Sequence, residues 1–205
     1  MNTYKKILSY LFFGILIIGG YAAKDYHIHK LYQKDIATKV LRFHVVANSD
    51  SKEDQSLKLK VRDAVGSYMA PKMKKACDRE ECEKIVTESI PDIIDMAKEV
   101  IKKEGYDYSV TANLEQTDFP VKTYGSYTFP EGEYEALNVV IGEGDGHNWW
   151  CVMYPNMCFS GSAYEVVDEN AKECLERALT PEEYESLMED KNYEVRFKYL
   201  SYCTK

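Results

Sequence analysis

The hydrophobic pattern divides the chain into an apolar start and an amphipathic body. An uncharged apolar run extends from Ile7 to Ala23, directly after Lys5 and Lys6. A basic start followed by an apolar stretch is typical of an export signal, and this run has the shortest length that can span a bilayer. We therefore expect residues 1–23 to be a signal peptide or an N-terminal membrane anchor. The polar residues 24–37 are expected to form a short linker or a juxtamembrane helix.

The body begins with a pattern that predicts a strand, a polar turn and a helix. Apolar residues alternate with other residues from Leu41 to Ala47, which is the period of a half-buried strand. The turn at residues 48–51 ends this strand. Asp50 with Glu53, or Ser51 with Asp54, has the spacing of a helix start. Apolar residues then recur at helical spacing, so we expect a helix over residues 52–68 that ends near Pro71.

Similar patterns predict the remaining elements. A helix is expected over residues 81–103 with a kink or restart at Pro91, and Thr180 has the position of an N-cap for a short helix. Strands are expected over residues 106–114, 121–129, 136–142, 148–154 and 194–200. This order predicts an α+β fold, in which a mixed, mainly antiparallel sheet carries helices packed on one face. We expect a single domain over residues 38–205.

The charge of the chain excludes some classes of partner. The net charge is −8, and removal of residues 1–23, which contain two lysines and no acid, changes it to −10. An acidic body disfavours nucleic acid and anionic membrane surfaces. It favours solubility, or a basic patch on a protein partner.

The six cysteines predict disulfides if the chain is exported. Cys151 and Cys158 flank a turn at residues 154–156 and form the favoured pair. Cys77 with Cys82 is the next local candidate, which leaves Cys174 with Cys203; buried free thiols are the alternative. Paired C-x-x-C spacing is absent, and His27 and His29 have no evident further ligand. We therefore predict neither a metal site nor a cofactor.

Two arrangements of residues would suit an exported hydrolase, which is the alternative to a binding function. His44 could act as a base oriented by Asp50 or Asp54, with Ser49 as nucleophile, or Cys151 could act as nucleophile with His147 or His44 as base. Neither has the setting of a nucleophile elbow or an identifiable oxyanion hole. A structural histidine and a structural cysteine are therefore favoured, and the sequence predicts no enzyme.

The glycine-rich segment 142–146 follows a predicted strand. A phosphate loop would lead into a helix, and the acids Glu143 and Asp145 would repel phosphate. We expect a hairpin turn with an acidic tip. Trp149 and Trp150 follow it, and in a strand they point to opposite faces of the sheet, so one of them is expected in the core.

Two sequence blocks resemble the stage II sporulation protein R family of endospore-forming bacteria. In that family an H-V-I-A-N-S-D-S segment precedes E-D-Q-x-L-K-x-K-V-R-D; the matching residues here are 44–51 and 53–63, with Val46 in the isoleucine position. The second block comprises residues 139–144, Gly146, residues 148–152, Pro155 and residues 158–159. The resemblance covers about residues 38–160.

The resemblance implies a signalling role without catalysis. Members of that family are made in the forespore and exported into the space between the two membranes. There they are needed for a membrane-embedded aspartic protease of the mother cell to process pro-sigma-E. The expected partner is thus that protease, which this chain would activate by binding. A structural envelope protein held by the N-terminal helix is a third possibility.

The polar residues of these blocks form the expected contact surface. The turn at residues 48–50 lies beside the stripe of Asp54, Lys58 and Arg62, which are four residues apart on the predicted helix. The expected partner-binding residues are Asn48, Ser49, Asp50, Asp54, Gln55, Lys58, Arg62, Asn148 and Trp149.

Overall fold

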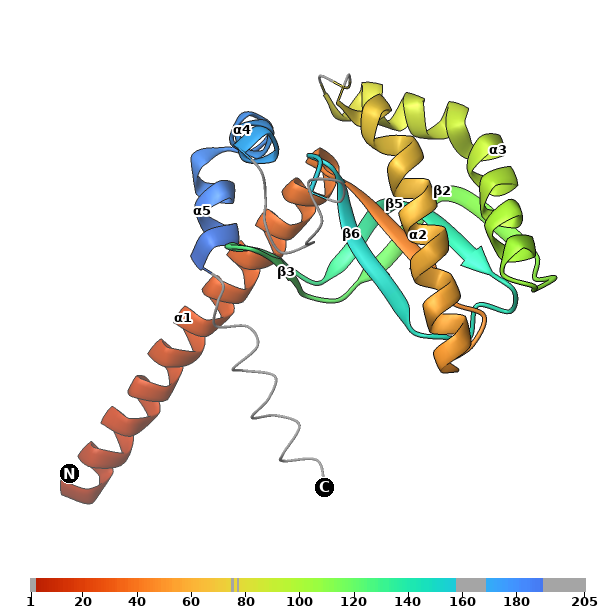
Figure 1. The fold of residues 1–205 in the computed structure, drawn as a ribbon. Helices are drawn as coiled ribbons and strands as arrows, with labels where there is room; N and C mark the ends of the chain where they lie inside the picture. Colours follow the sequence, from red (N-terminus) through yellow and green to blue (C-terminus); the bar gives the residue numbers. More distant parts are fainter. Residues whose placement is uncertain (1–2, 75, 77, 158–168, 190–205) are drawn as a thin grey trace.

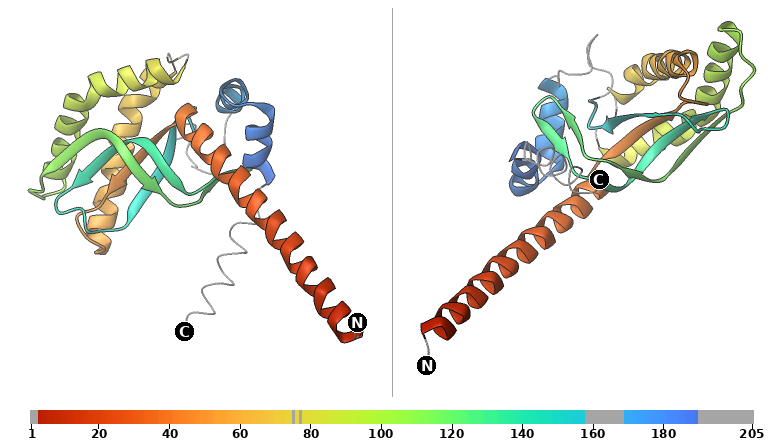
Figure 2. Two further views of the ribbon diagram at one scale, coloured as in Figure 1. Left: turned by 180° about the vertical axis from the view of Figure 1, so that it is seen from behind. Right: turned by 90° about the horizontal axis from the view of Figure 1, so that it is seen from below.

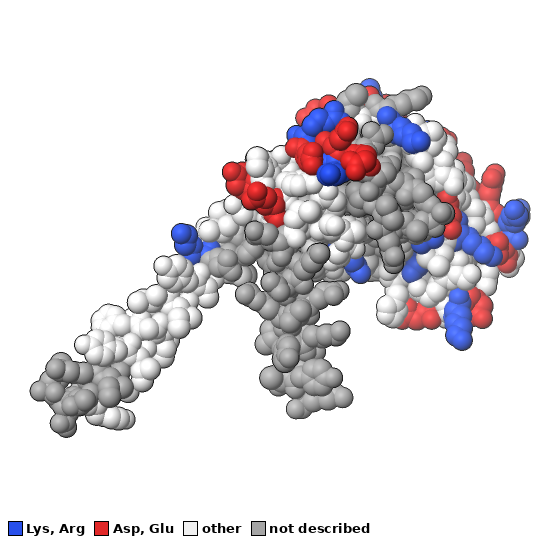
Figure 3. Space-filling view, turned by 60° about the vertical axis from the view of Figure 1, so that its left-hand side comes forward, with Lys and Arg blue, Asp and Glu red and all other residues white. Residues whose placement is uncertain are grey.

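A long N-terminal helix projects from the folded domain. In the computed structural model, which describes residues 3–74, 76, 78–157 and 169–189, helix α1 spans Thr3–Lys39 and includes residues 24–37. Its last turns enter the domain, where Ile36 and Val40 are fully buried (Figure 1). In the part of the chain that the structure describes, α1 alone is long and apolar enough to cross a membrane. Its apolar part forms the uncharged arm in Figure 3, so α1 is compatible with a signal sequence or a membrane anchor.

Four strands form the central sheet in the order β2-β5-β1-β6. β1 (Leu41–Val46) runs parallel to β5 (Gly132–Ile141) and antiparallel to β6 (Asn148–Tyr154), and β2 (Val110–Phe119) runs antiparallel to β5. The predicted α+β class with a mixed, mainly antiparallel sheet is therefore confirmed. β1 is an inner strand, and all six of its residues are buried. The expectation that it is half-buried was wrong, because elements cover both faces of the sheet around it.

Two long helices cover one face of the sheet (Figures 1 and 2). α2 (Lys52–Met73) continues two residues past Pro71, and α3 (Arg79–Lys103), whose ribbon bends along its length, contains Pro91. A proline removes one backbone hydrogen bond and crowds the preceding turn, which accounts for a kink. The apolar faces of both helices pack on side chains from the sheet, among them Phe43, Val139 and Met153.

A second apolar cluster lies on the opposite face of the sheet. It joins the end of α1, the hairpin of β3 (Lys122–Tyr124) and β4 (Tyr127–Phe129), and the helices α4 (Glu169–Ala178) and α5 (Pro181–Glu189). Thr180 caps α5 as predicted, because its Oγ1 accepts from the Glu183 amide at 3.3 Å. The buried Glu183 carboxylate also accepts from Lys39 Nζ at 2.6 Å. This ion pair attaches α5 to the base of α1.

A buried arginine ties the small hairpin to the sheet. Arg42 is fully buried, and its Nε donates to the Cys151 carbonyl at 2.9 Å. Four aromatic rings surround its guanidinium at 4.3 to 5.7 Å, namely those of Phe119, Tyr124, Phe129 and Tyr134. Cation–π contacts of this kind are strongest when the cation is desolvated. A half-buried β1 would expose Arg42, which is instead fully buried on the second covered face of the sheet.

Several predicted boundaries need correction. The strand expected over residues 106–114 begins at Val110, because the Tyr106 amide still bonds the Ile101 carbonyl in the cap that follows α3 around Gly105. The strand expected over 121–129 is two short strands joined at Gly125, whose φ is +59°. Helix α4 was not predicted. The strand expected over 194–200 lies outside the described residues.

The cysteines differ from part of the expectation. Cys82 and Cys174 are free thiols, so the pairings of Cys82 with Cys77 and of Cys174 with Cys203 were wrong. Cys82 is buried in the core of α2 and α3, where its thiol faces the Met73 sulfur at 3.3 Å. Burial raises the pKa of the Cys82 thiol to about 12. It is thus one of the buried free thiols that the sequence had left as an alternative.

Candidate interaction site at the end of β1

The two sequence blocks meet where β1 ends. Because β1 lies between β5 and β6, the loop of residues 142–147 crosses the end of β1 instead of closing a hairpin. The expectation of a hairpin turn was therefore wrong. The amide of Gly146 donates to the Ala47 carbonyl at 3.0 Å, and the amide of Asp145 donates to the Asn48 carbonyl at 3.2 Å. The crossing loop thus docks on the turn between β1 and α2.

Glycines make this close docking possible. Gly142 has a φ of +60°, and a Cβ atom there would lie 2.1 Å from Asn48 Oδ1. A Cβ atom at Gly146 would lie 2.3 Å from the Ser49 carbonyl oxygen. The same Asn48 Oδ1 accepts from the Glu143 amide at 3.0 Å. The side chain of Asn48 therefore occupies the space that the missing glycine side chain leaves open.

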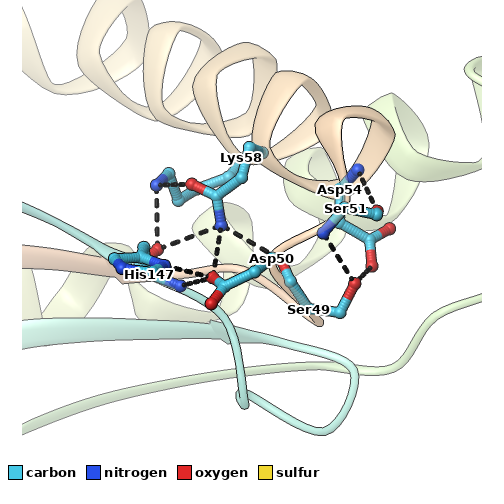
Figure 4. Close-up of polar contacts among 7 residues, drawn as sticks. Ser49, Asp50, Ser51, Asp54, Lys58 and His147 are labelled. Atoms are coloured by element: carbon cyan, nitrogen blue, oxygen red, sulfur yellow. Dashed lines mark hydrogen bonds and ion pairs between the residues drawn. The ribbon is translucent and has the colours of Figure 1, made fainter.

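A buried carboxylate organises the turn (Figure 4). Asp54 is 4% exposed, and its Oδ2 accepts from Ser49 Oγ at 2.6 Å and from Asn48 Nδ2 at 2.9 Å. Ser51 is the N-cap, because its Oγ accepts from the Asp54 amide at 3.1 Å. The Ser49 hydroxyl is the main cause that lowers the pKa of Asp54, with smaller help from Asn48. Asp54 is consequently a charged anchor of the turn.

A buried lysine holds the crossing loop from the side of the helix. Lys58 is 5% exposed, and its Nζ donates to the His147 carbonyl at 2.8 Å and to Gln55 Oε1 at 2.6 Å. Gln55 Nε2 in turn donates to the Ser49 carbonyl at 3.0 Å. Burial is the main cause that lowers the pKa of Lys58, and the positive charge of the nearby Arg62 lowers it further. Lys58 and Gln55 of α2 therefore connect the turn after β1 to the crossing loop.

An exposed acid–histidine pair forms the outer edge of the site (Figure 4). Asp50 Oδ1 accepts from the His147 amide at 2.5 Å and also pairs with Nδ1 of the His147 ring. The His147 side chain is 81% exposed and that of Asp50 is 53% exposed. The hydrogen bond from the His147 side chain is the main cause that lowers the pKa of Asp50. The pair presents a fixed polar surface to solvent.

An aromatic and cationic pair extends this surface along α2. The Arg62 guanidinium lies over the Trp149 ring at 5.1 Å, and Trp149 packs edge-on against the core residue Phe43 at 5.4 Å. Asn148 is exposed next to Trp149. We define the turn surface as Asp50, His147, Asn148, Trp149 and Arg62.

The structure brings all nine predicted contact residues into one region. Asn48, Ser49, Asp54, Gln55 and Lys58 make internal hydrogen bonds, and Asp54 and Lys58 are buried. Their role in partner binding stays a prediction; in this conformation they support the surface from within. His147 was missed as a surface residue, and only its place beside the glycine-rich loop could have indicated it.

His44 and Cys151 do not form a hydrolytic site with the described residues. His44 is 5% exposed and stacks on Trp150 at 4.0 Å with an interplanar angle of 8°. Burial is the main cause that lowers the pKa of His44 to about 4, although Asn148 opposes this change. Ser49 Oγ donates to Asp54 instead of to a histidine. Cys151 is buried; Cys158 lies outside the described residues, so their disulfide stays a prediction.

The described residues hold no group of three or more side chains suited to a metal ion. His27 lies exposed on α1, and nothing is described for the His29 side chain. The site at the end of β1 has loops joined by hydrogen bonds and an exposed acid–histidine pair, and its Ser49 hydroxyl is bonded to a carboxylate instead of to a histidine. Such an arrangement is suited to recognition by another macromolecule.

Comparisons with known proteins agree with the sequence blocks that build this site. The family model described as "Stage II sporulation protein R (spore_II_R)" matches residues 37–164. The chain is similar to the "Stage II sporulation protein R" of Bacillus subtilis (strain 168), with 36% identity over 155 residues, which cover 76% of this chain and 68% of that protein. No solved structure matches the chain. The chain belongs to the stage II sporulation protein R family, and it is therefore a sporulation protein.

Proposed function

We propose that this chain is an exported sporulation signal that activates a membrane-bound aspartic protease by binding to it, so that the protease processes pro-sigma-E. Membership of the family supports the signalling role. The apolar helix α1 fits delivery across a membrane, with the domain in the space between forespore and mother cell. Whether α1 is cleaved or kept as an anchor, the domain reaches the same side.

The observation that carries this proposal is the meeting of the two family blocks in the turn surface. Residues 44–63 and 139–152 are about ninety positions apart, yet they share the hydrogen bonds of Asn48, Asp50 and Lys58. A purely structural loop would not require an exposed pair such as Asp50 and His147. Exposed, well-ordered polar residues on loops more often serve binding than packing.

The buried network explains how such a surface would bind with little entropic cost. Asp54 fixes the turn and Lys58 fixes the crossing loop, so the groups of the turn surface are already in place. Preorganisation lowers the cost of ordering loops on association. In this mechanism the turn surface contacts the outward part of the protease in its active state more strongly than in its inactive state.

Co-expression tests the proposal in a host that lacks sporulation proteins. The candidate protease and pro-sigma-E are expressed with the full chain, with the chain lacking residues 2–23, or alone, and precursor cleavage is followed by immunoblot. We expect cleavage with the full chain alone. Among residues 2–23, none of those whose burial the structure describes belongs to the buried core, so the shortened chain should fold and stay in the cytoplasm without signalling. Equal cleavage in all three cultures would refute the proposal.

A further inference from the structure

Four residues form a row across the whole sheet on the face that also carries Arg42. Asn113 of β2 pairs with Asn138 of β5, Asn138 pairs with His44 of β1, and His44 pairs with Trp150 of β6. Directly paired residues of neighbouring strands point to the same face. We call these four residues the polar row. Asn113 is exposed, Asn138 and Trp150 are half-buried, and His44 is buried.

The polar row contains hydrogen-bonding groups without partners. Neither ring nitrogen of His44 has a hydrogen bond of normal geometry, and the residue is 5% exposed. Asn138 Oδ1 is also buried and unpaired, whereas Asn138 Nδ2 donates to Glu115 Oε1 at 2.7 Å. A buried polar atom without a partner is destabilising, so such atoms are rare outside functional sites. The row is thus incomplete as it stands.

The surroundings of the row favour a cation. Glu115 is exposed beside Asn113 on β2, and in the described part of the chain it forms no ion pair with a lysine or arginine. The Trp150 ring adds an aromatic surface. Carboxylates, amide oxygens and aromatic rings all attract a guanidinium. The nearby Arg42 does not fill this role, because its own guanidinium is held among four rings and donates to Cys151 and Tyr124.

We propose that the polar row and Glu115 form a second interaction site, which binds an arginine side chain from an extended segment of a protein partner. The guanidinium pairs with the Glu115 carboxylate and lies near the Trp150 ring. Asn138 Nδ2, displaced from Glu115, then donates to the adjacent ring nitrogen of neutral His44. The site lies on the sheet face and uses no residue of the turn surface, so it stands independently of the proposed function.

Arginine peptides test this site on the full chain held in nanodiscs of neutral lipid. The ligand is a blocked nine-residue peptide of alternating serine and arginine, and the control peptide has glutamate in place of arginine. Binding is measured by calorimetry, and nuclear magnetic resonance follows the Trp150 indole and the His44 ring nitrogens. We expect the arginine peptide alone to bind and to shift the His44 nitrogen signal toward a hydrogen-bonded value.

Variants that each neutralise one acidic side chain show where the peptide binds. Glu115→Gln keeps the acceptor for Asn138 and should weaken binding about tenfold, the share of one charge-assisted pair. Glu99→Gln removes an exposed acid from α3, and Asp50→Asn removes one from the turn surface; neither should change the affinity. Equal weakening by Glu115→Gln and Glu99→Gln would mean unspecific attraction and overturn the proposal. So would loss of binding with Asp50→Asn alone, or equal binding of the glutamate peptide.

Discussion

Replacement of Asp54 by asparagine tests whether a buried charge holds the turn surface in place. The Asp54 carboxylate accepts from Ser49 Oγ at 2.6 Å and from Asn48 Nδ2 at 2.9 Å, and the residue is 4% exposed. Asparagine keeps the size of the side chain but has no charge. Its amide NH₂ group would also face donors, because both Ser49 Oγ and Asn48 Nδ2 donate at this position. Hydrogen bonds to charged groups contribute about 1.5–3 kcal/mol each. Because the remaining amide oxygen keeps part of one bond, we expect a loss of about 2–3 kcal/mol in the free energy of unfolding.

Urea unfolding of the full chain in detergent, followed by tryptophan fluorescence, measures this loss. The midpoint should fall while the slope stays unchanged, since the mutation does not alter the surface exposed on unfolding. The pKa of Asp54 is lowered in the folded state, below about 3.9 in the unfolded chain. Its stabilising effect is therefore complete above the unfolded pKa and disappears as the pH falls through the folded pKa. The difference between the two proteins should be full at neutral pH and should shrink below about pH 4.

Glu53→Gln is the matched control, because Glu53 is exposed in the same first turn of α2. It should cost at most about 0.3–1 kcal/mol through the helix dipole. Equal destabilisation by both substitutions, or a difference that does not change with pH, would refute the view that Asp54 organises the turn.

Three further outcomes follow from the described contacts. Gly142→Ala should destabilise the domain by more than about 2 kcal/mol in the same urea assay, because it adds a clash with Asn48 to the strain of a positive φ. The control Gly105→Ala, where φ is +86° and the space around the Cβ position is open, should cost about 1 kcal/mol, and equal costs would contradict the reasoning. Glu183→Gln should speed amide hydrogen exchange in α5 and leave the exchange rates of α2 unchanged, since it breaks the ion pair with Lys39. Unchanged exchange in α5 would show that this ion pair is dispensable. In the native protein iodoacetamide should alkylate Cys174 well before Cys82 by mass spectrometry, because Cys82 is buried with a pKa of about 12; the reverse order would be inconsistent with this core.

Local signals in the sequence predicted the elements that carry the site. The strand β1, a helix start at Ser51, which was one of the two predicted starts, and the strand β6 follow from residues that are close along the chain, and the structure confirms each of these elements. The cap of α5 at Thr180 was predictable for the same reason. Such features depend on the chemistry of a few neighbouring residues, which a single sequence contains.

Long-range pairing was beyond the sequence patterns. The parallel pairing of β1 with β5 places β1 inside the sheet and turns the expected hairpin at residues 142–146 into a crossing loop. Arg42 and His44 are buried because other elements also cover their face of the sheet. A period-2 pattern shows which residues share a face, but it does not show whether that face is covered. The pairing of Asp50 with His147 depends on the same topology, which explains why His147 was missed.

The most direct test of the proposed function is the affinity between the full chain and the protease, each purified in its own nanodisc. His147→Ala removes the exposed ring of the turn surface but keeps the carbonyl that accepts from Lys58. His27→Ala is the matched control, because it removes an exposed histidine from α1. We predict that the wild type and His27→Ala bind equally and that His147→Ala binds about tenfold more weakly, as for the loss of one well-placed polar contact. Equal affinity of all three proteins, or no binding by the wild type, would contradict the proposal that the turn surface recognises the protease.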